Sequence, residues 1–425
     1  MLPDASPQVV TDFRRFWAGH TVSVVGSHVS AVALPLIAAL TLGAGAAGVS
    51  AVATAAYLPN VVLPLLAGHW LQTRKRRRAM ITADLVRFAA LLLIPISYAL
   101  GWLSVPFLVG IALVVGAASV VFDIGGFAYL PTLVPQAYLP KANRAMQGST
   151  TAAQVAGPGL AGLLVQIVGA PFAMLLDAIS YLASAYGVAA AKQPEPDPEP
   201  TPATSVFDGL RQLGANPFLR ALTAHAAIYN GAAQILVVNL VIFAVTDRGL
   251  SAGAYGLAIS AAGVGAFAGT MLALRLAARF GYGRAFALSL VLSTGAPLLI
   301  AVLPGTGTPF AAALAAVELI SGVGLGSANV LSVTLRQIVA PHGTIARTNG
   351  GYRLITFGVL PVGSALAGVL GQLVGARWGV AIGAAGLAAS AVPMFARRIR
   401  TLRTPESARA VVEPVRDLAL ATADR

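Results

Sequence analysis

Long apolar segments separated by short polar stretches fill almost the whole chain. An α-helix needs about 20 apolar residues to cross the hydrocarbon core of a bilayer, and twelve segments approach that length. The pattern therefore predicts an all-α membrane protein with twelve transmembrane helices. The expected spans lie near residues 15–42, 47–71, 80–100, 105–129, 146–168, 170–191, 219–245, 252–274, 285–303, 309–334, 352–374 and 377–395.

The apolar pattern repeats itself at an offset of 206 residues. The segment 160–170 matches 366–376 at eight of eleven positions. Internal repeats of this kind are typical of secondary transporters that hold a central site between two related halves. We therefore expect two pseudo-symmetric six-helix bundles. The expected parts are an N-terminal bundle (1–192), a linker with an amphipathic helix (193–218), a C-terminal bundle (219–396) and a tail (397–425).

Composition supports a membrane location and limits the chemistry. Only 10% of the residues are charged, against about 25% in soluble domains. Cysteine is absent, which excludes disulfides and thiolate chemistry. No lysine precedes Ser or Thr, and no His-Glu-x-x-His motif occurs. The sequence thus predicts neither an enzyme nor a cofactor or metal site.

The net charge of +13 raises the possibility of nucleic-acid binding, but its distribution argues against it. With the N-terminus inside, 25 of the 28 Lys and Arg residues fall on the inner side of the spans. This positive-inside bias predicts cytoplasmic N- and C-termini and contact with anionic lipid. Arg outnumbers Lys 25 to 3 and Ala and Gly are abundant, as in GC-rich bacterial coding, so we expect a bacterial cytoplasmic membrane protein.

Between the expected halves, proline occupies every second position from 194 to 202, which prevents helix formation and predicts a hydrated linker. Ser205 and Asp208 then fit a capping box before a short amphipathic segment. This segment predicts a helix on the inner membrane surface; alternatively, it is the ordinary start of the seventh span.

Three motifs resemble the major facilitator superfamily, in particular its bacterial drug and siderophore exporters, the group that includes enterobactin and macrolide efflux proteins. They are the basic loop 68–78, the segment 83–87 and the Gly-Pro motif 157–162. The resemblance implies a monomeric secondary transporter, and it implies an inner gate in the loop at Gly68, Gln72 and Arg78. Gln72 stands where the family has Asp, so we expect the Asp84 and Arg87 pair, one turn apart, to take part in the gate.

The motif in span five has a physical basis. Gly157 and Gly162 allow a neighbouring helix to approach closely, and Pro158 frees a carbonyl and bends the helix. Such a helix either seals one side of a cavity as part of an antiport mechanism, as the resemblance implies, or serves packing alone.

Four acids lie within the expected spans: Asp84, Asp123, Asp177 and Glu318. Charged groups are costly in a bilayer and usually face a wet cavity or a partner. Because spans four and ten line the cavity in the resembled fold, we identify Asp123 and Glu318 as proton-coupling candidates, and we expect Asp177 to be structural. Candidates for contact with substrate are His28, Asn230, Gln234, Asn239 and Asn329.

These observations predict a proton-coupled antiporter that exports amphipathic small molecules, such as a drug, antibiotic or siderophore, by alternating access. Its partners would be a lipophilic substrate, protons and membrane lipid. Two alternatives stay open: an importer or facilitator of a small metabolite on the same fold, and a non-transporting membrane sensor or assembly protein.

Overall fold

The computed structural model describes residues 7–61, 63, 75–135, 138–191, 206–339 and 345–408, and these contain helices but no strand. The helices of the first half are α1 (Pro7–Leu36), α2 (Ala46–Tyr57), α4 (Arg76–Ala99), α5 (Val105–Leu133), α6 (Leu139–Val168) and α7 (Ala170–Ala189). A π-helical turn, η1 (Ile37–Thr41), follows α1.

After the linker, the short helix α8 (Val206–Ala215) precedes the second half. That half contains α9 (Pro217–Ile242), η3 (Phe243–Asp247), α10 (Ala252–Phe280), α11 (Tyr282–Gly295), η4 (Ala296–Val302), α12 (Gly307–Val339), α13 (Ile345–Val374), α14 (Ala376–Ser390), η5 (Val392–Phe395) and α15 (Arg397–Arg400).

Eleven helices among the described residues are long and apolar enough to cross a membrane. They coincide with eleven of the twelve expected spans. The remaining one, near 47–71, begins as α2, and residues 62 and 64–74 lie outside the described part of the chain. The all-α class is confirmed.

The sequence repeat is also a repeat of backbone geometry. Gly43, Gly101 and Gly169 adopt positive φ in the turns of the first half, and the residues 206 positions later, Gly249, Gly307 and Gly375, do the same. Only glycine enters this region without strain. The two π-helical turns are related by the same offset, so the halves share their local irregularities as well as their helices.

Helix packing repeats at the same offset. A side chain on Gly116 of α5 would collide with the carbonyl of Ala56, and one on Gly322 of α12 would collide with the carbonyl of Ala262. Because these contacts join equivalent helices within each half, the pseudo-symmetry extends to the interior of both bundles.

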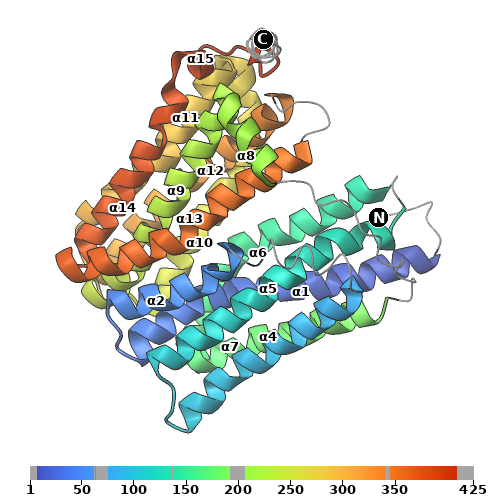
Figure 1. Cartoon of the computed structure of the whole chain (residues 1–425). Coiled ribbons are helices and arrows are strands. Elements are labelled where there is room, and N and C mark those ends of the chain that lie inside the picture. The colour runs from blue at the N-terminus through green and yellow to red at the C-terminus, as the bar shows by residue number, and fades with distance from the viewer. Residues whose placement is uncertain are drawn as a thin grey trace.

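In the described part of the chain, the two bundles meet near one end (Figure 1). Contacts between them are dominated by α6 with α10 and by α2 with α13. Gly162 of α6 packs against Gly256 of α10, and Gly368 of α13 packs against Ser50 of α2. In Figure 1 the bundles diverge towards the end that carries the described N-terminus. The positive-inside bias of the sequence predicts that this end is cytoplasmic.

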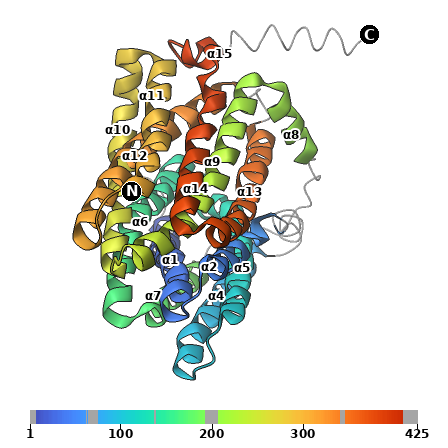
Figure 2. The ribbon, with the colours of Figure 1, turned by 90° about the vertical axis from the view of Figure 1, so that its left-hand side faces the viewer.

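The short helix α8 is separate from the seventh span. It ends at Ala215, and Asn216 then caps α9 by accepting hydrogen bonds from the backbone N–H groups of Phe218 and Leu219 at 3.0 and 3.2 Å. In Figure 2, α8 projects beside the upper end of α9. The alternative that this segment simply starts the seventh span is therefore wrong, whereas Ser205 and the side chain of Asp208 lie outside the described residues.

We call the close contact between Gly162 of α6 and Gly256 of α10 the seal, and the end of the molecule at which it lies the closed end. Because the seal depends on the absence of a side chain at Gly256, we predict that Gly256→Leu will open the closed end. Its Cβ has no room against the carbonyl of Pro158 and the backbone of Gly162. Since the chain contains no cysteine, a single Ser50→Cys at the same end, where Ser50 is buried against Gly368, reports access to this end. We expect Gly256→Leu to raise its labelling by a membrane-impermeant maleimide several-fold.

The matched control is Gly110→Leu in α5, where an added Cβ meets nothing within 4 Å. It should leave the labelling rate unchanged. An equal rate in the Gly256 variant and the parent would contradict the assigned role of this contact.

Candidate transport cavity and its charged residues

Asp123 lines a cavity of about 410 Å³ between α1, α5 and α6 of the first half. Its side chain is exposed to this space, with Phe16 and His20 on α1 and Asn143 and Met146 on α6 among the other lining residues. Asp123 therefore faces a cavity from a membrane-spanning helix, which is one of the settings in which membrane acids are tolerated.

A basic residue of the other half lies within electrostatic range of Asp123. Arg353 is on α13, is exposed, and its guanidinium lies 5.3 Å from the ring centroid of Phe357. Sequence reasoning missed this pairing because no local spacing connects residues in different bundles. The structure thus places a base of the second half within electrostatic range of an acid of the first half.

Glu318 lies on α12 in the second half, where it is half-buried. Its carboxyl group has no hydrogen-bond or ion-pair partner among the described residues. Tyr229 of α9 and Tyr255 of α10 lie within range of its charge. A carboxyl group without a fixed counter-charge in such a setting is available to bind a proton or a cation.

Asp84 and Arg87 form the ion pair that their spacing predicts, and it is buried inside the first half. The Arg87 guanidinium also lies between two aromatic rings, 4.4 Å from the centroid of Phe122 on α5 and 4.1 Å from that of Tyr181 on α7. Cation–π contact of this kind stabilises a desolvated cation. In the described region, every contact of the Asp84–Arg87 pair lies within the first bundle. The pair therefore does not link the two bundles directly in this conformation, and its role in the gate stays a prediction.

Asp177 is surrounded by hydroxyl groups. Ser30 of α1 donates a hydrogen bond to it, and Ser180 donates another at 2.9 Å. The hydroxyls of Ser27 and Tyr181 share a hydrogen bond of 3.1 Å across the same α1–α7 contact. Two donors and complete burial support the structural role expected for Asp177.

Three amide residues expected to line the cavity instead connect α9 to α13. Asn230 donates to the carbonyl of Thr356 at 2.8 Å, and Gln234 accepts from Ser364 at 3.2 Å. Asn239 donates to the carbonyl of Ala367 at 3.1 Å and is completely buried. Its Nδ2 also donates to the carbonyl of Ile235 at 2.9 Å, whereas its buried Oδ1 has no hydrogen-bond partner in the described part of the chain. Asn239 is thus not open to a cavity in this conformation, and its contact with substrate stays a prediction.

The Gly-Pro motif lies at two helix contacts. Gly157 packs against His28 of α1, so His28, which is half-buried, serves packing at least in part. Pro158 deprives the Gln154 carbonyl of its helical donor, and that oxygen faces Gly263 of α10. The motif thus forms part of the seal between the bundles.

The remaining candidates are exposed or lie outside the described chain. Asn329 is exposed on α12 and Arg78 is exposed at the start of α4. Gly68 and Gln72 lie outside the described residues, so the basic-loop gate stays a prediction.

Comparisons with known proteins agree with this architecture. A profile of the family described as transmembrane secretion effectors matches residues 4–424. The chain is 25% identical over 363 residues to the multidrug efflux pump Tap of Mycolicibacterium fortuitum, covering 82% of this chain and 87% of Tap. It is also 25% identical over 144 residues to the uncharacterised MFS-type transporter YvqJ of Bacillus subtilis (strain 168), a match that spans 34% of each chain.

Among solved structures, a bacterial homologue of the iron transporter ferroportin in its inward-facing state superimposes with a TM-score of 0.71 at 16% identity, covering 92% of this chain and 98% of that one. Its outward-facing state gives 0.57, with 90% and 98% coverage. Both states share the fold of this chain.

The buried ion pair predicts strongly non-additive stability effects. Asp84→Asn leaves Arg87 uncompensated and should lower the free energy of unfolding by about 3 kcal/mol. Asp84→Asn with Arg87→Gln should cost clearly less than that single change. Unfolding midpoints in detergent, with the exposed Asp247→Asn as control, provide the measurement; a double variant less stable than the single would contradict the assignment.

Proposed function

Because the chain belongs to the transmembrane secretion effector family of major facilitator superfamily transporters, we propose that it is a proton-coupled antiporter that exports amphipathic small molecules. The observation that carries the proposal is the one-ended contact between two pseudo-symmetric bundles, with Asp123 and Glu318 on opposite halves. Such halves can expose a central site to each side of the membrane in turn.

In the proposed cycle the described conformation is the one that loads substrate. The bundles diverge at the basic end (Figure 1), and Gly162 and Gly256 pack closely at the other end. Protonation of Asp123 or Glu318 from the outside would accompany inward opening, and substrate would then displace the proton. The membrane potential supplies about 2.3 kcal/mol per charge per 100 mV, which is enough to concentrate a substrate tens-fold.

The proposed substrate class follows from the lining. Around Asp123 the cavity presents apolar and aromatic side chains with few polar groups, among them Phe16, Leu130 and Met146. Such a lining suits a bulky lipophilic molecule, since apolar surfaces contribute most of the contact and a few polar groups orient the ligand. The relation to the multidrug efflux pump Tap supports export as the direction.

Replacement of the proton carrier should separate coupling from binding. If Glu318 carries the proton, Glu318→Gln will reduce proton-driven uphill transport in everted vesicles at least tenfold while leaving substrate-for-substrate exchange intact, because exchange needs no net proton movement. If Asp123 carries the proton instead, Asp123→Asn will reduce uphill transport in the same way and leave exchange intact.

The control is Asp247→Asn, an exposed acid at the end of η3, which should retain both activities. Full uphill transport in both carboxyl variants would exclude these acids from coupling. Movement of substrate only down its gradient in the parent protein would favour a facilitator instead.

A further inference from the structure

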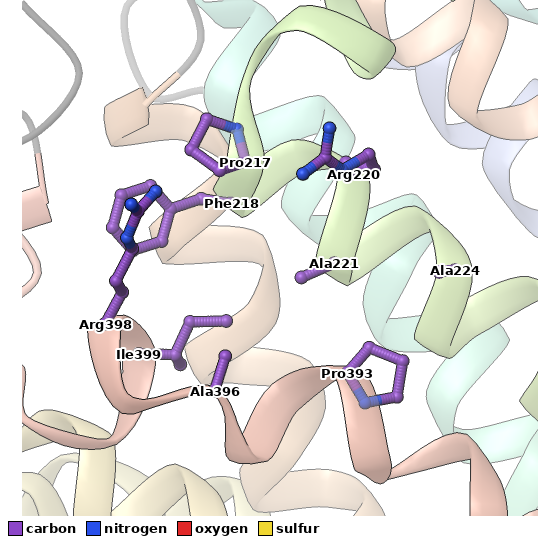
Figure 3. Close-up of a pocket in the computed structure, with 9 residues that line it drawn as sticks. All are labelled: Pro217, Phe218, Arg220, Ala221, Ala224, Pro393, Ala396, Arg398 and Ile399. Atoms are coloured by element: carbon purple, nitrogen blue, oxygen red, sulfur yellow. The ribbon is translucent and has the colours of Figure 1, made fainter. Parts of the chain in front are cut away.

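A groove between the start of α9 and the end of the last span contains two arginines from different elements. Arg220 belongs to α9 and Arg398 to α15 (Figure 3). The groove has a volume of about 390 Å³. Its other lining residues are Pro217, Phe218, Ala221, Ala224, Pro393, Ala396 and Ile399.

Neither guanidinium in this groove makes a hydrogen bond or ion pair with a described residue. Two other arginines of the second half do make such bonds: Arg248 donates to the carbonyls of Gly305 and Leu303 at 3.1 and 3.2 Å, and Arg377 donates to that of Ala301 at 2.9 Å. None of the nine lining residues is acidic. Two cations on one groove without a counter-charge attract an anion.

The walls of the groove are apolar away from the arginines. Ala224 lies two turns into α9 from Pro217, and Pro393 belongs to the end of the last span. Figure 2 shows α9 and α14 running side by side towards α15. The groove thus has a charged rim at one end and an apolar wall on the surface of two transmembrane helices. A bilayer changes in the same way, from charged lipid headgroups to apolar acyl chains.

The charged rim lies at the end of the bundle that the positive-inside bias assigns to the cytoplasm. Arg397, Arg398 and Arg400 all belong to α15 at this end. The cytoplasmic leaflet holds the anionic phospholipids, and basic pockets between transmembrane helices on that side bind their headgroups.

We propose that this groove binds an anionic phospholipid of the inner leaflet. Arg220 and Arg398 contact the headgroup phosphate, and the first part of an acyl chain lies along Ala221, Ala224 and Pro393. A free phosphate ion would use the arginines but leave the apolar wall empty, which is why a lipid is the better occupant. The site belongs to the second bundle alone and does not depend on what the cavity transports.

Native mass spectrometry of the purified full-length protein in detergent, titrated with phosphatidylglycerol or phosphatidylcholine, tests the proposal. Phosphatidylglycerol should bind the parent more tightly than phosphatidylcholine does. Arg220→Gln with Arg398→Gln should weaken phosphatidylglycerol binding about fivefold for each arginine removed. The control, Arg397→Gln with Arg400→Gln, changes the net charge equally on residues that do not line the groove and should bind as the parent does.

A second variant tests the apolar wall while keeping both charges. Ala224→Phe fills the groove and should lower phosphatidylglycerol binding, and an unchanged unfolding midpoint verifies that it is folded. Equal losses in the two arginine pairs would overturn the proposal in favour of general surface attraction. Full competition by inorganic phosphate, or full binding in Ala224→Phe, would overturn it in favour of a simple anion site.

Discussion

Close approach of helix backbones through glycine is the constraint on which the two-bundle architecture depends. Between lipid-immersed helices the hydrophobic effect gives little attraction, so association relies on close packing and hydrogen bonds. Gly162 against Gly256, and Gly368 against Ser50, allow such packing at one end of the molecule. Few hydrogen bonds accompany this packing among the described residues. The Ser50 hydroxyl donates to the carbonyl of Ser364, and the Ser251 hydroxyl donates to Oε1 of Gln166 at 3.4 Å. A seal with so few hydrogen bonds can open without leaving many polar groups unsatisfied.

The two halves share a backbone but differ in their chemistry. At the repeat offset, Leu290 and Ser293 of the second half stand where Asp84 and Arg87 form their ion pair in the first. The second half instead uses the amide of Asn239 inside its bundle. The ion pair joins helices inside the first half, whereas Asp123 and Glu318 have no hydrogen bond or ion pair in the described structure. Groups with internal partners are thus distinct from the groups that we propose for coupling.

The sequence predicted the features that arise from local pattern and from the repeat. The all-α class, eleven of the spans and the Asp84–Arg87 contact follow from apolar length and helical spacing. The sequence did not predict which face of a mostly apolar helix points towards the cavity. Asn239 was therefore expected at the cavity although it faces α13, and the proximity of Arg353 to Asp123 was missed because the two belong to different bundles. The rings that flank Arg87 were also missed, because Phe122 and Tyr181 come from two other helices of the same bundle that local spacing does not connect.

The most direct test of alternating access compares distances at both ends of the same protein. Spin labels on Arg78→Cys with Arg284→Cys report the open end, and labels on Trp102→Cys with Thr308→Cys report the closed end; all four positions are exposed, and each pair is related by the repeat. Electron–electron double resonance across a change of pH or on addition of substrate should show the first distance shortening as the second lengthens. Distances that stay fixed at both ends under every condition, in protein that transports, would contradict the account.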